Sequence, residues 1–287
     1  HTNESFSEDD FLKHLLAGIQ YAMGDNLQLD YSKAKSKRMP EENRFTKTTL
    51  SIGQFTEPTE MTVLPNLDIL VAQRRGEILM YDNASGELKE VAKLDVYWKA
   101  EVQGVNAEEG LMGIQKDPNY ATNNWVYAFY SPTGDQEINR LSRFKFANGV
   151  WDMASEQIIL ELYSQRNICC HTGGSIAFDK DGNLFLSTGD NSTPFNQPNT
   201  PYILNGFAPL DGREGNKQWD ARRSSGNSND LRGKILRIKV NEDGSYTIPE
   251  GNLYPQGTEG TRPEIYAQGL RNPYRISVDQ KTSFLYW

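Results

Sequence analysis

The stretch Ile168–Ser175, ICCHTGGS, gathers side chains that could do chemistry: two adjacent cysteines, a histidine, two glycines and a serine. An accessible imidazole that titrates near neutral pH is the usual general base in enzymes. We expect Gly173 and Gly174 to turn the backbone tightly and to leave the imidazole of His171 uncovered. Asp190 lies 19 residues further on and could orient the imidazole or hold it charged. The alternative is a histidine that only donates a hydrogen bond to a loop carbonyl.

The chain has two cysteines, Cys169 and Cys170. A zinc site needs spaced pairs of ligands, such as C-x2-C with a second pair elsewhere, so metal binding by these cysteines is disfavoured. The C-x-x-C pattern of a redox motif is also absent. Two interpretations stay open: a disulfide between the neighbours, which would stiffen the turn before His171, or two small, half-buried side chains in a strand.

Two further stretches carry candidate binding residues. GLRNPYR places Arg271 and Asn272 before Pro273, whose fixed φ favours a rigid loop. A guanidinium and an amide on such a loop suit a planar, polyanionic ligand, whereas the alternative is a surface arginine beside a capping asparagine. AEEGLMGI offers Glu108 and Glu109, for which we expect a solvated pair of carboxylates.

The composition excludes some classes of function. The net charge of the chain is −8, and its Lys and Arg residues are scattered, so the basic surface of a nucleic-acid-binding protein is missing. No apolar run approaches the roughly 20 residues that span a bilayer, and the first residues lack the pattern of a signal peptide. We therefore expect a soluble chain with no transmembrane segment and no nucleic-acid partner.

These residues need elements to position them, and the N-terminal part predicts a single helix. In SFSEDDFLKHLLAGIQYAMGD, Ser7 can cap an amphipathic helix, and its apolar residues recur at helical spacing before Gly24. The following polar, Lys-rich segment predicts a linker over residues 25–48. We place the boundary between an N-terminal part, residues 1–24, and the main domain, residues 49–287, in this linker.

From residue 49 the chain changes to short strands bounded by Gly, Asn, Asp and Pro. A loose unit, an Ile followed three residues later by an Asp, a turn and an apolar strand, starts at Ile114, Ile176 and Ile276, at offsets of 62 and 100 residues. The longer offset contains an insertion at about residues 191–230. Repeats of this size predict an all-β fold, a partial β-propeller with about three and a half blades, which is too few to close a ring.

Four stretches of the chain resemble the glucose/sorbosone dehydrogenase family, the soluble quinoprotein sugar dehydrogenases with six-bladed propellers. They occur in the family's order between residue 49 and the end of the chain: EEGLMGIQKDPNYATNNWVYAFYSP, CCHTGGSIAFDKDGNLFLSTGD, DLRGKILRIKVNEDGSYTIPEGNLYP and RPEIYAQGLRNPYRISVD. The CCHTGGS version is similar to that of large multidomain bacterial relatives. The resemblance implies oxidation of an aldose or another alcohol by hydride transfer to pyrroloquinoline quinone.

The resemblance also assigns roles to residues. His171 matches the base that removes the proton from the sugar hydroxyl, and Asp190 matches its carboxylate partner. Arg271 and Asn272 match residues that contact the quinone, and Glu108 stands where close relatives often carry Gln. The family's calcium ion implies ligands beyond Trp287, because its carbonyl ligands follow the last strand of this chain. A cytochrome c-type electron acceptor and a periplasmic, extracellular or cell-surface location follow by the same analogy.

The N-terminal residues, HTNESFSEDDFLKHLLAGIQYA, resemble the last loop and helix of a ThuA-like domain, which precedes the propeller in those relatives. The chain also starts without Met and stops in the aromatic run SFLYW, which is typical of a strand. We interpret the chain as part of a larger bacterial protein that holds the remaining blades and the ThuA-like domain. We expect the chain by itself to be inactive.

Two other functions stay open. The first is a propeller that keeps the fold without the cofactor and acts as a scaffold that binds carbohydrate or protein. The second is a carbohydrate-binding or hydrolytic element inherited from the ThuA-like part.

Overall fold

The computed structural model describes residues 8–22, 44–101, 105, 107–193 and 207–287. The chain divides into two compact units, residues 1–52 and residues 53–287, which are described separately.

The first unit contains the predicted helix, α1 (Asp9–Ala22). Its first turn carries Asp9 and Asp10, whose negative charges favour the positive end of the helix dipole. Ser7, the predicted cap, and most of the predicted linker at residues 25–48 lie outside the described residues. Within the described residues, no helix combines the length and apolar content that a membrane crossing requires.

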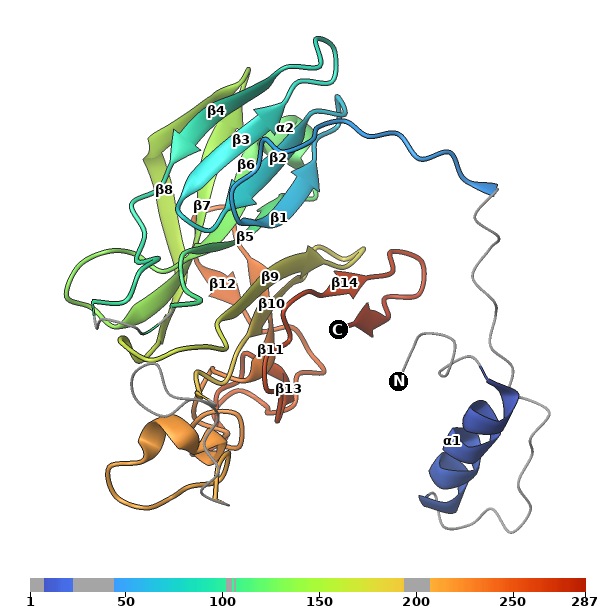
Figure 1. The fold of residues 1–287 in the computed structure, drawn as a ribbon, viewed down its shortest axis with the longest axis vertical. Helices are drawn as coiled ribbons and strands as arrows, with labels where there is room; N and C mark the ends of the chain where they lie inside the picture. The colour runs from blue at the N-terminus through green and yellow to red at the C-terminus, as the bar shows by residue number, and fades with distance from the viewer. Residues whose placement is uncertain (1–7, 23–43, 102–104, 106, 194–206) are drawn as a thin grey trace. The chain divides into compact units, whose positions relative to one another are not determined.

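The second unit is built almost entirely of antiparallel sheets, as Figure 1 shows. The strands of the first sheet are, in order, β1 (Pro58–Val63), β2 (Ile69–Gln73), β3 (Glu77–Tyr81) and β4 (Leu88–Lys93). Those of the second sheet are β5 (Leu111–Lys116), β6 (Trp125–Tyr130), β7 (Ile138–Ala147) and β8 (Val150–Tyr163). The short helix α2 (Tyr120–Asn123) lies between β5 and β6.

The third sheet consists of β9 (Gly173–Phe178), β10 (Leu184–Thr188), β11 (Lys234–Val240) and β12 (Tyr246–Thr247), and β13 (Ile265–Gln268) also pairs with β11. The predicted insertion lies between β10 and β11 and contains two 3-10 helices, η4 (Lys217–Trp219) and η5 (Ala221–Arg223). A final hairpin joins β14 (Ser277–Val278) to β15 (Leu285–Tyr286).

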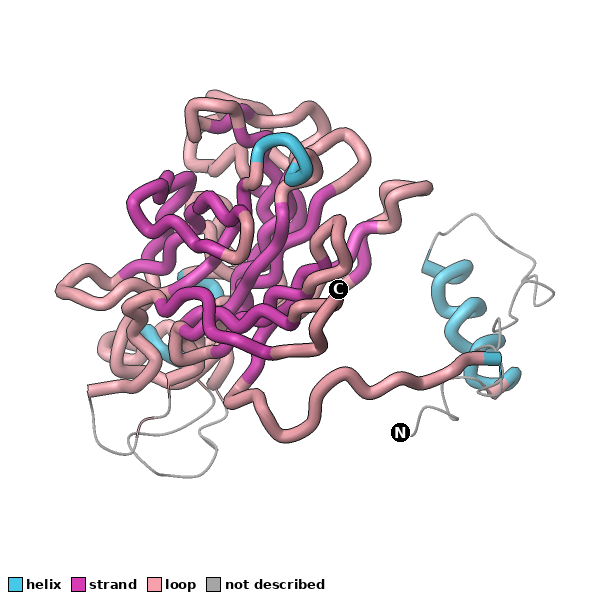
Figure 2. Tube along the Cα trace, turned by 90° about the horizontal axis from the view of Figure 1, so that it is seen from above, coloured by secondary structure: helices cyan, strands magenta, loops and turns pink. Residues whose placement is uncertain are grey.

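The first strands of consecutive sheets lie next to one another. Strand β1 contacts β5, β5 contacts β9, and β9 contacts β14, while each sheet extends outward from its first strand (Figure 1). Figure 2 shows the same strands, in magenta, from above. This arrangement around an inner edge is that of a β-propeller. The predicted all-β propeller class and the N-terminal helix are confirmed.

The side chains of β5 and β6 alternate between two cores. Leu111 of β5 and Ala128 of β6 pack into the core shared with the first sheet. Met112 and Phe129, their neighbours along the strands, pack into the core shared with the third sheet. Successive residues of a strand point to opposite faces, so a sheet between two others is apolar on both sides. This explains the nearly continuous apolar run WVYAFY in β6.

The predicted repeat unit coincides with the inner hairpins. Ile114 lies in β5, Ile176 lies in β9, and Ile276 comes immediately before β14. In each case the Asp three residues later accepts a hydrogen bond from the backbone N–H two residues beyond it, which stabilises the turn. The donor and acceptor atoms are the backbone N of Asn119 and Oδ1 of Asp117 (2.8 Å), N of Asp181 and Oδ1 of Asp179 (2.9 Å), and N of Lys281 and Oδ1 of Asp279 (2.7 Å).

Two glycines allow the second and third sheets to approach each other at the inner edge. A Cβ atom placed on Gly113 would lie 2.0 Å from the carbonyl oxygen of Gly174. Gly174 has a φ of +110°, and a Cβ there would lie 2.6 Å from Cβ of Met112. Since real Cβ atoms do not approach other atoms this closely, the contact between these sheets requires glycine at both positions.

Candidate active site

His171 lies in the loop between β8 and β9, and its backbone is held from two sides. The backbone N–H of His171 donates to Oε2 of Glu108 over 2.6 Å, and its carbonyl oxygen accepts from the backbone N–H of Asn191 over 3.2 Å. Both Cys170 and His171 have positive φ, at 101° and 64°. Two consecutive non-glycine residues in this region indicate a locally strained backbone that its surroundings must stabilise.

The imidazole of His171 forms a close pair with a carboxylate. Nδ1 of His171 lies 2.7 Å from Oδ1 of Asp190, and the side chains are only 5% and 2% exposed. The same oxygen of Asp190 accepts the backbone N–H of Ser192 over 2.9 Å. A carboxylate beside Nδ1 favours the tautomer that carries its proton there, so Nε2 presents the lone pair. The arrangement is therefore that of a base, His171, whose ring is oriented by the carboxylate of Asp190.

Gly173 and Gly174 turn the backbone as predicted, with φ of 68° and 110°, but the expectation that they leave His171 uncovered was wrong, because its side chain is buried. A Cβ on Gly173, whose φ is +68°, would lie 2.7 Å from the backbone N of Gly189. A Cβ on Gly189 would in turn lie 1.9 Å from the carbonyl oxygen of His171. The glycines bring the loop after the cysteines against the end of β10, and this close approach is what brings His171 to Asp190.

The loop that carries Arg271 and Asn272 contacts the same segments. The carbonyl oxygen of Arg271 accepts the backbone N–H of Asp190 over 2.8 Å. Oδ1 of Asn272 accepts the backbone N–H of Gly173 over 3.1 Å. The side chain of Arg271 is exposed, and among the described residues it has no carboxylate partner. The structure thus brings all five predicted site residues, Glu108, His171, Asp190, Arg271 and Asn272, to one place in the fold.

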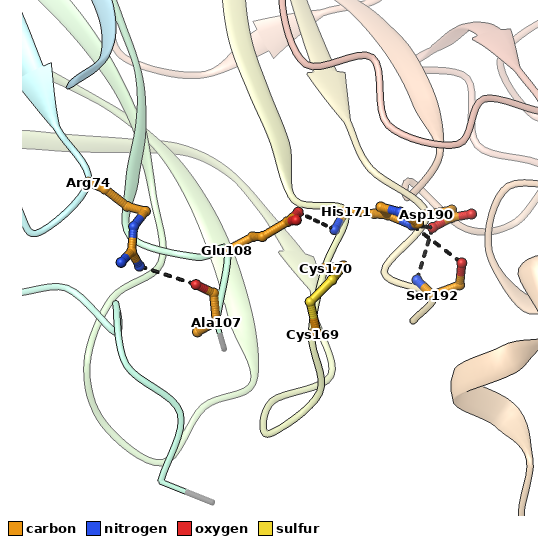
Figure 3. The surroundings of a disulfide bond; sticks show 8 residues. All are labelled: Arg74, Ala107, Glu108, Cys169, Cys170, His171, Asp190 and Ser192. Atoms are coloured by element: carbon orange, nitrogen blue, oxygen red, sulfur yellow. Dashed lines mark hydrogen bonds and ion pairs between the residues drawn. A yellow bond between two sulfur atoms is a disulfide. The ribbon is translucent and has the colours of Figure 1, made fainter. Parts of the chain in front are cut away.

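Cys169 and Cys170 form a disulfide immediately before His171 (Figure 3). Of the two interpretations left open, the structure has the disulfide, and the alternative of two side chains in a strand was wrong, because residues 169–172 lie in a loop and β9 starts only at Gly173. Their sulfur atoms and a carboxylate oxygen of Glu108 lie within 4.8 Å of one another. Both sulfurs belong to the disulfide, so they provide no thiolate for a metal ion.

The expected solvated pair of glutamates was wrong for Glu109, which is 2% exposed. Burial raises the pKa of Glu109 to about 7, against the lowering effect of the Arg166 charge. Burial also lowers the pKa of Arg166. The Oγ of Ser164 donates to Glu109 over 3.4 Å. Glu109 is buried because it starts the turn into β5, whose residues pack on both faces.

Asn191 is a contact residue that the sequence analysis did not select. Its Oδ1 accepts the backbone N–H of Gln165 over 2.7 Å and Nη1 of Arg232 over 3.1 Å, and its carbonyl oxygen accepts from Nη2 of Arg223. With a φ of 52°, it occupies the left-handed region that Asn tolerates better than most residues. Its position directly after Asp190, the candidate carboxylate, was the signal in the sequence that could have pointed to Asn191.

Residues 55–287 match the family model described as "Glucose / Sorbosone dehydrogenase". The chain belongs to this family. The match covers all of the described sheets and all five candidate site residues. The resemblance found in the sequence is therefore confirmed for the main domain, whereas the ThuA-like identity of the N-terminal residues stays a prediction.

Solved structures and curated proteins also resemble this family member. A putative oxidoreductase (glucose dehydrogenase) from Thermus thermophilus is 26% identical, with a TM-score of 0.60, and the match covers 81% of this chain and 58% of that one. The PQQ-bound aldose sugar dehydrogenase of Streptomyces coelicolor is 27% identical, with a TM-score of 0.51, and covers 83% and 57%. Mouse Hedgehog-interacting protein is 27% identical over 210 residues, which is 68% of this chain and 26% of that protein.

The chain spans about half the length of the curated bacterial relatives that it matches, with 51% and 53% of those proteins covered.

Proposed function

We propose that this glucose/sorbosone dehydrogenase family member takes part in the oxidation of an aldose or another alcohol by pyrroloquinoline quinone, with His171 as the base. The observation that supports this most directly is the 2.7 Å contact between Nδ1 of His171 and Asp190, which leaves Nε2 as the proton acceptor. The bound quinone of the Streptomyces coelicolor relative supports the choice of cofactor.

In that reaction, residues of this chain would accept the proton of the substrate hydroxyl. The substrate hydroxyl loses its proton to Nε2 of His171, while the hydrogen on the same carbon leaves with its two electrons. When bound, pyrroloquinoline quinone supplies a carbonyl group that accepts this hydride. Asp190 stabilises the imidazolium that forms, because a buried carboxylate beside Nδ1 favours the charged ring. The substrate carbon becomes a carbonyl, which gives a lactone when the substrate is an aldose.

The chemistry of the site suits the acidic quinone. The backbone of Arg271 is fixed beside Asp190 through its carbonyl oxygen, and its exposed guanidinium would contact the carboxylates or quinone oxygens. Asn272 accepts the N–H of Gly173 through Oδ1, so its amide NH2 is the part that would face the cofactor. The Glu108 carboxylate would oppose an anionic ligand, but it is engaged with the backbone N–H of His171. We assign Glu108 to this backbone contact as well as to the rim of the cofactor site.

Calcium does not fit the side chains found here. Ca²⁺ prefers six to eight oxygen ligands. The one group of metal-type side chains found among the described residues consists of Glu108 and the two disulfide sulfurs, which provides a single carboxylate. We derive no step from calcium at this position, and ligands beyond Trp287 stay a prediction.

The proposal includes a location and partners. An oxidising compartment, such as the periplasm or the cell exterior, suits the Cys169–Cys170 disulfide. The electrons would leave the reduced cofactor for a cytochrome c-type acceptor. Inactivity of this chain by itself also stays a prediction, as do the additional blades of a longer protein.

The test is dye reduction by the longer protein that the proposal includes, with the additional blades present, incubated with pyrroloquinoline quinone and Ca²⁺ over a panel of aldoses. We expect His171→Ala to lower kcat by about 10²-fold or more, the usual contribution of a general base, with the cofactor absorbance retained. His14→Ala is the matched control, because His14 is an exposed histidine of α1. Activity that survives His171→Ala would reject the base, and absence of both activity and cofactor absorbance in the unaltered protein would reject the dehydrogenase.

A binding scaffold without cofactor is the second candidate. Mouse Hedgehog-interacting protein, which its name describes as a binding protein, matches 68% of this chain. The carboxylate of Glu108 next to His171 also favours this candidate, since it places a negative charge where the acidic quinone would bind. The same cofactor absorbance experiment separates the two functions.

A further inference from the structure

A cleft of about 510 Å³ lies between the end of β8 and the segment that joins β10 to β11. One of its lining residues, Arg223, donates a hydrogen bond to the carbonyl oxygen of Asn191. One wall is formed by the end of β8 and the residues after it, including Tyr163 and Gln165. The other walls come from the insertion between β10 and β11 and include four cationic side chains. These cations are Arg213, Lys217, Arg223 and Arg232.

Two of the four cations are already neutralised by carboxylates. Arg213 forms two hydrogen bonds with Asp211, at 2.7 and 2.6 Å, and Arg232 forms two with Asp230, at 3.0 and 2.6 Å. Asp220, which also lines the cleft, is engaged with Arg222 over 2.8 Å. Asp211 and Asp220, the two carboxylates that line the cleft, are thus paired with arginines other than Arg223.

The remaining two cations, Lys217 and Arg223, have no carboxylate partner among the described residues. Nη2 of Arg223 donates to the carbonyl oxygen of Asn191 over 2.5 Å, whereas its buried Nε has no hydrogen-bond partner in the described part of the chain. Burial, together with the charge of Arg232, lowers the pKa of Arg223. Tyr163, Asp230 and Asp190 act in the opposite direction on this pKa without forming an ion pair with Arg223. A partly buried guanidinium that lacks an ion-pair partner is stabilised by an anion.

We propose that this cleft is a binding site for an oxyanion, the phosphate or carboxylate group of a small molecule, held by Arg223 and Lys217. The planar guanidinium and the ammonium group offer the donors that such oxygens require. Tyr163 and Gln165 on the opposite wall add an aromatic ring and an amide, which suit the ring and hydroxyl groups of a sugar acid or a sugar phosphate. This site does not depend on the proposed dehydrogenase activity.

The test is calorimetric titration of the 287-residue chain with inorganic phosphate in a chloride buffer. We expect saturable binding to one site that weakens as the salt concentration rises. Loss of one charge-assisted hydrogen bond weakens binding by about tenfold, so Lys217→Gln and Arg223→Gln should each show this decrease. Lys180→Gln is the charge-matched control, because Lys180 is an exposed residue of the β9–β10 turn that pairs with Asp181.

Lys217→Gln keeps the test valid if the loss of the Arg223–Asn191 contact prevents folding, since no side-chain hydrogen bond of Lys217 contributes to the described structure. Competition against phosphate identifies the source of the oxyanion: glucose 6-phosphate should compete if the group is a phosphate, and glucuronate if it is a carboxylate. Neutral glucose should not compete. Phosphate binding no tighter than that of chloride, or an affinity unchanged in Lys217→Gln, would overturn the proposal.

Discussion

His171 illustrates how neighbours, rather than residue type, give a histidine its chemistry. The ring is almost fully buried, and Asp190 occupies its Nδ1 side. The backbone of His171 is fixed on both sides, by the Glu108 carboxylate and by the N–H of Asn191. The orientation of the ring thus comes from residues that are not its neighbours in the sequence.

Glu109 gives a prediction at the residue scale, because its carboxyl group is buried with a pKa raised to about 7. A raised pKa means that the folded protein holds this proton more tightly than the unfolded chain. Its contribution to stability is therefore complete below about pH 4.5, the ordinary value, and is lost as the pH rises through about 7. Glu109→Gln removes this titration.

We expect the melting temperature of Glu109→Gln, measured relative to the unaltered protein, to rise between pH 5 and pH 8. One pKa unit corresponds to about 1.4 kcal/mol, and one kcal/mol to about 2–4 °C in a domain of this size, so the relative change should be several degrees. Calorimetry at several pH values measures it. Glu87→Gln, at an exposed glutamate of the β3–β4 turn, is the control. A difference that does not vary with pH would contradict the buried, protonated carboxyl group.

The sequence predicted the members of the site better than their environment. His171, Asp190, Arg271 and Asn272 were selected by residue type and by the family's motifs, and the structure brings them together. The burial of Glu109 could not be predicted, because AEEG reads locally as a polar turn. Arg166, whose charge acts on the pKa of Glu109, lies 57 positions away in the sequence, so only the fold shows that the two side chains influence each other.

At the scale of elements, the inner strands depend on backbone contact as much as on apolar side chains. The apolar run WVYAFY of β6 is visible in the sequence, and the strand was predicted from it and from the turn residues around it. The alternation of its side chains between two cores is seen only in the fold. Gly113 and Gly174 carry no such signal, since a glycine in a strand has several possible causes. Their function, contact between neighbouring sheets, appears only when both strands are placed.

Gly174→Ala should destabilise the protein strongly. The new Cβ would lie 2.6 Å from Cβ of Met112 and 2.8 Å from the Phe129 ring, in addition to the strain of a φ of +110°. We expect a loss of about 2–5 kcal/mol in the free energy of unfolding, measured by urea denaturation.

Gly182→Ala is the matched control for this substitution. Gly182 also has a positive φ, of +76°, but nothing lies within 4 Å of the position that its Cβ would occupy. The control therefore measures the backbone strain alone, at about 1 kcal/mol or slightly more. Equal losses in the two variants would show that the contact between the sheets has no energetic importance.

At the scale of the whole molecule, the division into two compact units predicts that residues 53–287 fold without the N-terminal unit. The cores described above lie entirely within this part, and the family match begins at residue 55. We expect a protein of residues 53–287 to keep the melting temperature and cooperativity of the 287-residue chain, as measured by calorimetry.

A chain that starts at residue 64 provides the comparison, because it lacks β1 and so removes the pairing of β1 with β2 and its contact with β5. It should melt at a clearly lower temperature. If residues 53–287 were destabilised to the same degree, the N-terminal unit would have to contribute to the stability of the sheets.

The turn that follows each inner strand has a consequence for how such proteins diversify. Asp117, Asp179 and Asp279 each close their own hairpin with a local hydrogen bond, whatever the length of chain between them. The long segment between β10 and β11 therefore adds residues to the chain without changing the place in the fold where the next inner strand, β14, starts at Ser277. A change in the length or charge of this segment would therefore alter the surface around it while leaving the hairpins of the inner strands in place.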